Sequence, residues 1–253
     1  MTIVSRLIGG LIGVCLGLAP AARAEAPCGR ELVVPTVVQR GPTCAVAAVV
    51  MAARGIGVDL TLESLAREVP VWTDGVDFFD IEEALSKRGV RGMTFRGDVA
   101  LAARFVDAGV PVVLAVDLHG GKHAVTMAGH AADRVGGRCP ATPARVRLID
   151  PWDGRVSSRA RHDLERIQFG RQLFVAWPRG AGWEERVAEA GVDLGPLVAQ
   201  DRRFRAEAWV RRAKQHASPN PQMLALLERA VAEDPGWPEA RALRDEVKRA
   251  VAP

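Results

Sequence analysis

The chain has 253 residues, of which 48% are hydrophobic and 25% are charged, with 25 glycines and 16 prolines. This composition fits one large or two modest globular domains and excludes a disordered, collagen-like or coiled-coil chain. The formal net charge is only +4, and Arg6 and Arg23 account for half of it. A charge this balanced argues against a nucleic-acid partner, which normally needs a basic stripe or patch.

The first 24 residues have the pattern of a secretory signal peptide. One positive charge in Met1–Arg6 precedes the apolar run Leu7–Leu18, and Ala22-Arg23-Ala24 supplies small residues at the cleavage positions. The apolar run is shorter than the roughly 20 residues that span a bilayer. We therefore expect cleavage before Glu25 and a periplasmic or secreted bacterial protein with no membrane span after signal removal.

Three cysteines remain after that cleavage: Cys28, Cys44 and Cys139. Exported proteins fold in an oxidising compartment, where an odd number of cysteines leaves one thiol unpaired. Cys28 lies near the new N-terminus and Cys139 in a loop rich in glycine and proline, whereas Cys44 begins an apolar helical segment. The simplest assignment is a disulfide between Cys28 and Cys139, with Cys44 free.

Helical segments dominate the first part of the mature chain. The segment 44–55 is apolar on every side and stops at Gly55, which predicts a central buried helix, with Pro42-Thr43 as its turn and N-cap. Further helices are predicted from cap residues over 62–69 after Thr61, 81–89 with Asp80 and Glu83 as a capping box, and 99–109 after Asp98.

The pattern then changes to alternating and β-branched residues. Strands are predicted over 111–116, 123–129, 145–150 and 172–177, and Asp117–Lys122 joins the first two as a hairpin through Gly120-Gly121. Helices followed by an antiparallel sheet indicate the α+β class.

Beyond Pro178 and Gly180–Gly182 the sequence becomes helical again, over 206–217, 223–235 and 237–251. We therefore divide the mature chain into a domain over 25–180 and a small all-α domain over 181–253. The small residues Ala230 and Ala240, with Pro235 between them, resemble a tetratricopeptide repeat and the start of the next. An unrelated helical hairpin is the alternative.

Four residues have the chemistry of a nucleophilic cysteine site. Cys44 lies at a helix N-terminus, where the helix dipole lowers a thiol pKa and free N–H groups point at an incoming carbonyl oxygen. Gln39 can donate its amide to the same oxyanion. His123 opens a strand after the hairpin and can act as base, and Asp150 closes the next strand and can orient it.

These residues, in this order, resemble the papain-like cysteine peptidases of the double-glycine leader (bacteriocin-processing) type, family thirty-nine. The matching segments are VVQRGPTCAVAAVVMAARG with Gln39 and Cys44, HAVTMAG with His123, and VRLIDPWDG with Asp150. The resemblance covers about residues 34–178. It implies a papain-like fold, a Cys nucleophile, a His base, an Asp orienter and a Gln oxyanion donor, acting on a peptide or protein substrate.

Several alternatives remain at the level of sequence. Cys44 can be an inert buried thiol, in which case the chain is a binding module or scaffold whose C-terminal helices dock an envelope protein. A thiol acyl-transferase, transglutaminase-like or directed at peptidoglycan, is a second alternative. His119 and His130 compete with His123 for the role of base. Because Gly120-Gly121 prevents His119 and His123 from sharing a helical turn, we predict no metal, and no other feature calls for a cofactor.

Overall fold

The computed structural model describes residues 28–252 except 72–74, 119, 137 and 181. The predicted signal peptide, the first 24 residues, and His119 lie outside the described residues. The strands are β1 (Cys28–Glu31), β2 (Val90–Arg96), β3 (Val112–Leu118), β4 (Gly121–Ala132), β5 (Arg145–Ile149), β6 (Val156–Ala160) and β7 (Gln168–Pro178). The helices are α1 (Cys44–Gly55), α2 (Leu62–Ala66), α3 (Phe78–Ser86), α4 (Val99–Asp107), α5 (Arg161–Ile167), α6 (Trp183–Glu189), α7 (Leu194–Ala213), α8 (Pro221–Glu233) and α9 (Pro238–Val251).

The described strands form one antiparallel sheet in the order β2-β7-β3-β4-β5-β6, and β1 pairs with the end of β4. Strand residues alternate between two hydrophobic clusters. Val113 and Phe174 face α1 to α3, whereas Leu114 and Leu173 face α4 to α6. Helices therefore cover both faces of the sheet. The predicted α+β class is confirmed: helices pack on an antiparallel sheet, and further helices follow it in the chain.

Helix α1 has the bounds that its sequence predicts, and its residues from Ala45 to Ala53 are buried. The Thr126 hydroxyl of β4 donates to the carbonyl of Ala48 in α1 at 3.0 Å, which fixes the helix against the strand. Thr43 occupies the N-cap position, but its side chain bonds to Arg40 and does not cap the helix. The first N–H groups of α1 therefore lack a side-chain cap.

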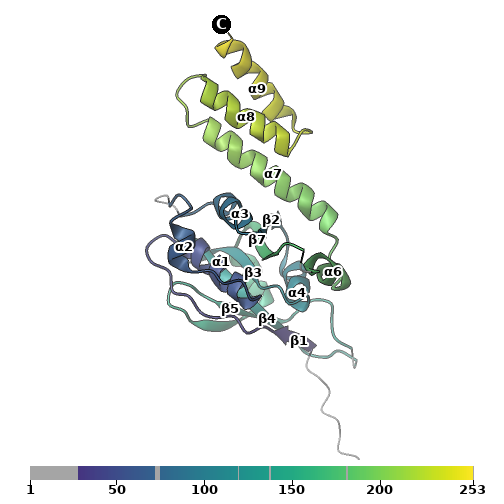
Figure 1. Ribbon diagram of the computed structural model, residues 1–253. Helices are drawn as coiled ribbons and strands as arrows, with labels where there is room; N and C mark the ends of the chain where they lie inside the picture. Colours follow the sequence, from purple (N-terminus) through teal and green to yellow (C-terminus); the bar gives the residue numbers. More distant parts are fainter. Residues whose placement is uncertain (1–27, 72–74, 119, 137, 181, 253) are drawn as a thin grey trace, which may run out of the picture.

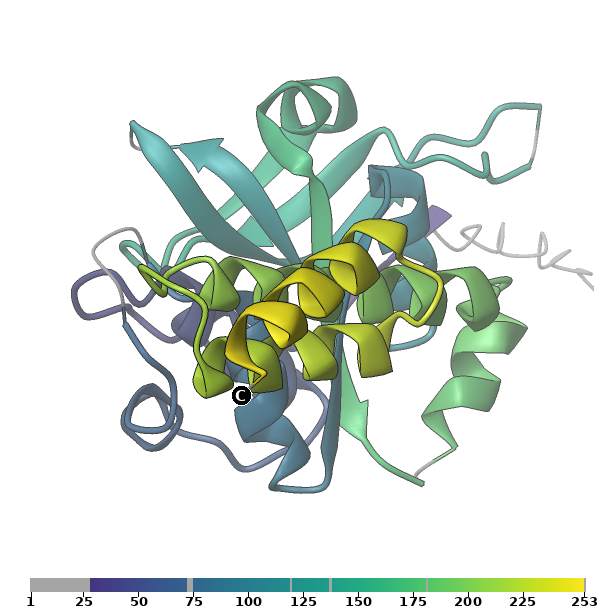
Figure 2. The same ribbon diagram turned by 90° about the horizontal axis from the view of Figure 1, so that it is seen from above.

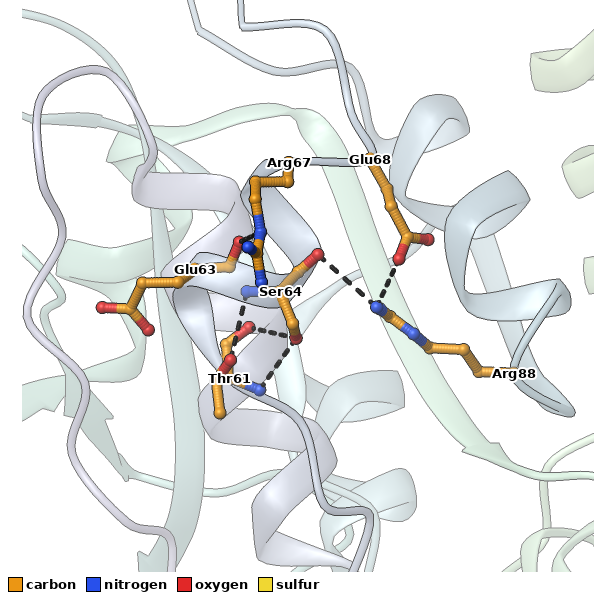
Figure 3. A network of polar contacts seen from close by, with 6 residues as sticks. All are labelled: Thr61, Glu63, Ser64, Arg67, Glu68 and Arg88. Atoms are coloured by element: carbon orange, nitrogen blue, oxygen red, sulfur yellow. Dashed lines mark hydrogen bonds and ion pairs between the residues drawn. The ribbon is translucent and has the colours of Figure 1, made fainter.

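Polar contacts join α2 to the end of α3 (Figure 3). The Thr61 and Ser64 side chains form a reciprocal capping box, which satisfies two N–H groups at the start of α2. Arg88, just after α3, donates to the Ser64 carbonyl and to Glu68. The predicted cap at Thr61 is confirmed, and the exposed edge of this helix pair is held by polar groups.

The predicted start of α3 is wrong. Asp77, and not Asp80, is the N-cap, accepting the N–H of Phe79 at 3.0 Å. The helix begins earlier because Phe78 and Phe79 are both buried, Phe78 stacked on Phe174 and Phe79 against Trp209 of α7. Asp80 is buried inside the helix and forms an ion pair with Arg212.

The hydrophobic core continues past the predicted domain boundary. Val187 of α6, Val192 in the loop after it and Leu197 of α7 belong to the same cluster as the sheet residues that face α4. Helix α6 and the start of α7 therefore pack on the same core as the sheet. Figures 1 and 2 show α7, α8 and α9 stacked in order over the side of the sheet that carries β2 and α3. The boundary at residue 180 and the tetratricopeptide interpretation stay predictions.

The predicted disulfide is present. Cys28 and Cys139 are bonded, with 5.3 Å between their Cα atoms, and Cys44 is free. The bond joins β1 to the loop between β4 and β5. Among the residues that the structure describes, no helix combines the length and apolar character needed to cross a bilayer.

Candidate active site

The structure brings Cys44, His123 and Asp150 together. Cys44 is the first residue of α1, His123 lies near the start of β4, and Asp150 directly follows β5. His123 Nε2 and Asp150 Oδ1 are 2.7 Å apart, and the imidazole also forms a hydrogen bond with the Cys44 side chain. The His123 side chain is only 5% exposed, whereas Asp150 is 20% exposed. The imidazole thus lies between a thiol and a carboxylate, away from bulk water.

The thiol and imidazole shift each other's acidity. Burial alone disfavours the Cys44 thiolate, but hydrogen bonds from His123 and from the N–H groups of Ala124 and Ala45 outweigh it and lower the pKa of Cys44. Burial likewise disfavours the imidazolium, but its hydrogen bonds to Cys44 and Asp150 and their negative charges raise the pKa of His123. The two pKa values move toward each other, which favours a thiolate–imidazolium pair.

The turn after β5 fixes the carboxylate. Asp150 Oδ1 accepts the Trp152 N–H at 2.8 Å as well as the His123 contact, and the Asp150 carbonyl accepts the Gly154 N–H at 2.8 Å. Gly154 has a φ of +75°, and a Cβ there would lie 2.9 Å from Thr36. The DPWDG turn therefore requires glycine at this position to hold Asp150 beside His123.

Gln39 is hydrogen-bonded to the same turn through its backbone and to Gly41 through its side chain. Its backbone N–H donates to the Pro151 carbonyl at 2.8 Å, and its side-chain Nε2 donates to the Gly41 carbonyl at 2.9 Å. The amide group has two hydrogens, so one remains for an oxyanion. Its Oε1 is buried and has no hydrogen-bond partner among the described residues.

His130, one of the alternative histidines, points elsewhere. Its Nε2 lies 2.7 Å from Oδ1 of Asp107, the last residue of α4. It lines a cavity with the Cys28–Cys139 disulfide.

The sequence analysis did not predict two backbone donors of the site, the N–H groups of Trp152 and Ala124. The DPWDG turn indicates the Trp152 donor, and no local pattern indicates the Ala124 donor.

No family model and no curated protein matches this chain. Solved structures of peptidase domains do match over slightly more than half of it. The peptidase domain of Streptococcus ComA, a bifunctional ABC transporter involved in a quorum-sensing pathway, is 16% identical with a TM-score of 0.47, and the match covers 58% of this chain and 100% of that one.

Two further structures are similar in the same way. A double glycine motif protease from an AMS/PCAT transporter, in complex with its leader peptide, is 15% identical with a TM-score of 0.43, covering 58% of this chain and 94% of that one. The N-terminal peptidase C39-like domain of a toxin secretion ATP-binding protein from Vibrio parahaemolyticus is 13% identical with a TM-score of 0.41, covering 56% and 100%. At these identities and TM-scores the likenesses carry no information on activity.

Proposed function

We propose that this chain is an exported cysteine peptidase that uses Cys44 as nucleophile, His123 as general base and acid, Asp150 as orienter and Gln39 as oxyanion donor. The observation that carries the proposal is the continuous contact from thiol to imidazole to carboxylate, with the pKa of Cys44 lowered and that of His123 raised. An inert buried thiol has no such partners.

The proposed reaction follows from these positions. The Cys44 thiolate attacks the carbonyl carbon of a peptide bond, and the negative charge moves to the carbonyl oxygen. Backbone N–H groups at the start of α1, which have no side-chain cap, stabilise that oxygen. The second hydrogen of the Gln39 side-chain amide stabilises it as well. The His123 imidazolium gives its proton to the leaving amine as the C–N bond breaks. Water, deprotonated by His123, then hydrolyses the thioester and restores the thiol.

The Cys28–Cys139 disulfide supports the exported part of the proposal, because such bonds persist mainly in oxidising compartments. Intact mass of the protein purified from its producing bacterium tests this part. A mature N-terminus at Glu25 is expected, and a membrane-bound species that retains residues 1–24 would contradict it.

Peptidase activity is tested with a diverse peptide mixture followed by mass spectrometry. The wild-type chain should generate new peptide termini, and the Cys44→Ala chain, purified in the same way, should generate none. If neither chain cleaves any peptide and Cys44 of the folded wild type resists iodoacetamide, a binding module on this fold replaces the peptidase.

A further inference from the structure

A single cleft of about 650 Å³ extends from Cys44 and His123 to the side of helix α7. The α7 residues that line it include Phe204, Glu207, Ala208 and Arg211. These positions recur three and four residues apart, so they form one face of the helix. A helix that follows the whole sheet in sequence therefore supplies one wall of the space that contains the reactive thiol.

Side chains of α7 hold the helix against edge strand β2. Asp201 Oδ1 accepts the N–H of Thr94, and Gln200 Oε1 accepts the N–H of Arg96, both at 2.9 Å. Thr94 and Arg96 are two residues apart in β2, so their N–H groups point to the same side of the strand. At the sheet edge these groups would otherwise lack a partner. Two hydrogen bonds from the backbone of β2 to side chains of α7 thus hold the helix along the edge of the sheet.

A second set of contacts joins α7 to the opposite wall, which α3 and the segment before it provide. Trp209 packs edge-on against Phe79, with 4.8 Å between ring centroids. Arg211 forms an ion pair with Asp77, and Arg212 with Asp80. These contacts fix the distance between the two walls, so packing within the protein determines the width of the cleft.

The charged side chains of α7 that line the cleft have partners within the protein, and two aromatic rings lie among them. Arg211 and Arg212 have the carboxylate partners described above, and Arg205 pairs with Glu233 at 2.8 Å. Phe204 is half-buried, and Phe169 of β7 is 41% exposed beneath the Lys122 ammonium, at 4.7 Å from the ring centroid. Both rings line the cleft. The cleft therefore offers a ligand these two aromatic rings among charged and polar side chains.

We propose that α7 is the specificity wall of the active site, and that the cleft takes an extended polypeptide segment with an apolar side chain against Phe204 and Phe169. The inference rests on the proposed peptidase function, because the cleft is continuous with the thiol that would attack the segment's carbonyl. An apolar side chain gains free energy by leaving water for these rings, and a polar one does not. The C-terminal helices thus select substrate as well as completing the fold.

Two series of thiol-reactive peptides test this proposal on the full mature chain. N-iodoacetyl peptides and peptide chloromethyl ketones extend from the thiol in opposite directions, and each carries Leu or Ser at one position with Gly elsewhere. Each alkylation rate of Cys44 is divided by the rate with free iodoacetamide on the same variant. At one position at least, the Leu peptide should react about tenfold or more faster than the Ser peptide.

Phe204→Ala should reduce this Leu/Ser ratio to below about threefold, and Phe204→Leu should retain most of it. The matched control is Trp237→Ala. Trp237 is half-buried beneath Arg203, 4.4 Å from the ring centroid, much as Phe204 is half-buried beneath Arg96, at 5.3 Å, but Trp237 does not line the cleft. This control should leave the ratio unchanged. A wild-type ratio near one, or a ratio that Phe204→Ala leaves intact, overturns the role of α7 while free iodoacetamide still reports a reactive Cys44. A Cys44 unreactive toward every reagent removes the peptidase proposal, and the role of α7 with it.

Discussion

Strand β4 carries two histidine–aspartate pairs with the same hydrogen-bond length. His123 Nε2 lies 2.7 Å from Asp150 Oδ1, and His130 Nε2 lies 2.7 Å from Asp107 Oδ1. Their surroundings differ. His123 also contacts the free thiol of Cys44, whereas His130 lies beside the Cys28–Cys139 disulfide, whose sulfurs are already bonded. The pairing of an imidazole with a carboxylate is thus common to both places, but only the His123 pair is next to a free thiol.

The second pair has a structural explanation that the first lacks. Asp107 ends α4, and its backbone carbonyl accepts a hydrogen bond from Arg30 of β1, the residue paired with His130 in the sheet. His130 thus ties the end of α4 to the β1–β4 edge. The comparison teaches that dyad geometry alone does not identify a reactive site, and it supplies a matched control for every test of the first pair.

The largest expected effect separates the two histidines. Cys44→Ala and His123→Ala should each reduce peptide turnover by a factor on the order of 10⁴ or more, because the nucleophile or its proton carrier is lost. His130→Ala should change turnover by less than about threefold. This difference is measured as the turnover rates of the three purified variants, with their folding checked by circular dichroism. Equal losses from His123→Ala and His130→Ala would mean that the contrast between the pairs is false.

The disulfide beside His130 should matter for stability and not for chemistry. It closes a loop with a sequence separation of 111, for which loss of chain entropy predicts up to about 5 kcal/mol, with about 2–4 kcal/mol typical of measured cases. The Cys28→Ser/Cys139→Ser double variant should therefore show a lower midpoint in urea but normal turnover of its folded fraction. An unchanged midpoint would show that packing of β1 against β4 suffices without the bond.

Gln39 tests the oxyanion part of the first site. Gln39→Ala should lower turnover by about 100-fold, the usual effect of removing one oxyanion donor. Gln39→Glu retains the size of the side chain but replaces the donating NH₂ with an acceptor, so we expect at least as large a loss. Both effects should appear mainly in kcat. A loss confined to KM would assign Gln39 to substrate binding or to the Pro151 turn.

The sequence predicts those parts of the fold that depend on local pattern. The bounds of α1 follow from an apolar run that ends at Gly55, and Asp98 caps α4 as expected. Cys44, His123 and Asp150 meet because each lies at an end of a predictable helix or strand. Their assignment as catalytic remains a prediction.

Features that depend on distant contacts could not be predicted in this way. Strand β2 was not expected, because Gly92 interrupts its pattern; a Cβ there would lie 2.9 Å from the Glu82 side chain. The free edge of β2 is completed by Gln200 and Asp201, more than a hundred residues later. The role of α7 beside the active site likewise has no local signal.

The two aspartates offer a smaller test of the comparison. Asp150→Ala should lower turnover by about 10- to 100-fold, because the imidazole loses its orienter but retains its proton-transfer role. Asp150→Asn should cost less, since the amide oxygen can still accept from both His123 and the Trp152 N–H. Asp107→Ala is the matched control, and we expect its turnover to stay within about threefold of wild type. A larger loss from Asp150→Asn than from Asp150→Ala would contradict the orienting role.

The smallest expected effect is a shift in the pH dependence of Cys44 alkylation. Iodoacetamide reacts with the thiolate, so the rate rises with pH through the pKa of Cys44. Because that pKa is lowered, the half-maximal rate should fall below the ordinary thiol value of about 8.5. In His123→Ala the hydrogen bond and charge that lower this pKa are lost while burial of the thiol still raises it, so the half-maximal pH should move up to or beyond about 8.5.

Near pH 7 the His123→Ala change should slow alkylation, since a higher pKa of Cys44 leaves less of the thiol as thiolate. Peptide turnover should differ from alkylation in one respect. It should also decline as pH rises through the pKa of His123, because the imidazolium that protonates the leaving amine is then lost. In His130→Ala both profiles should match the wild type. A displaced profile in His130→Ala would show that the second pair, at the other end of β4, is electrostatically linked to Cys44.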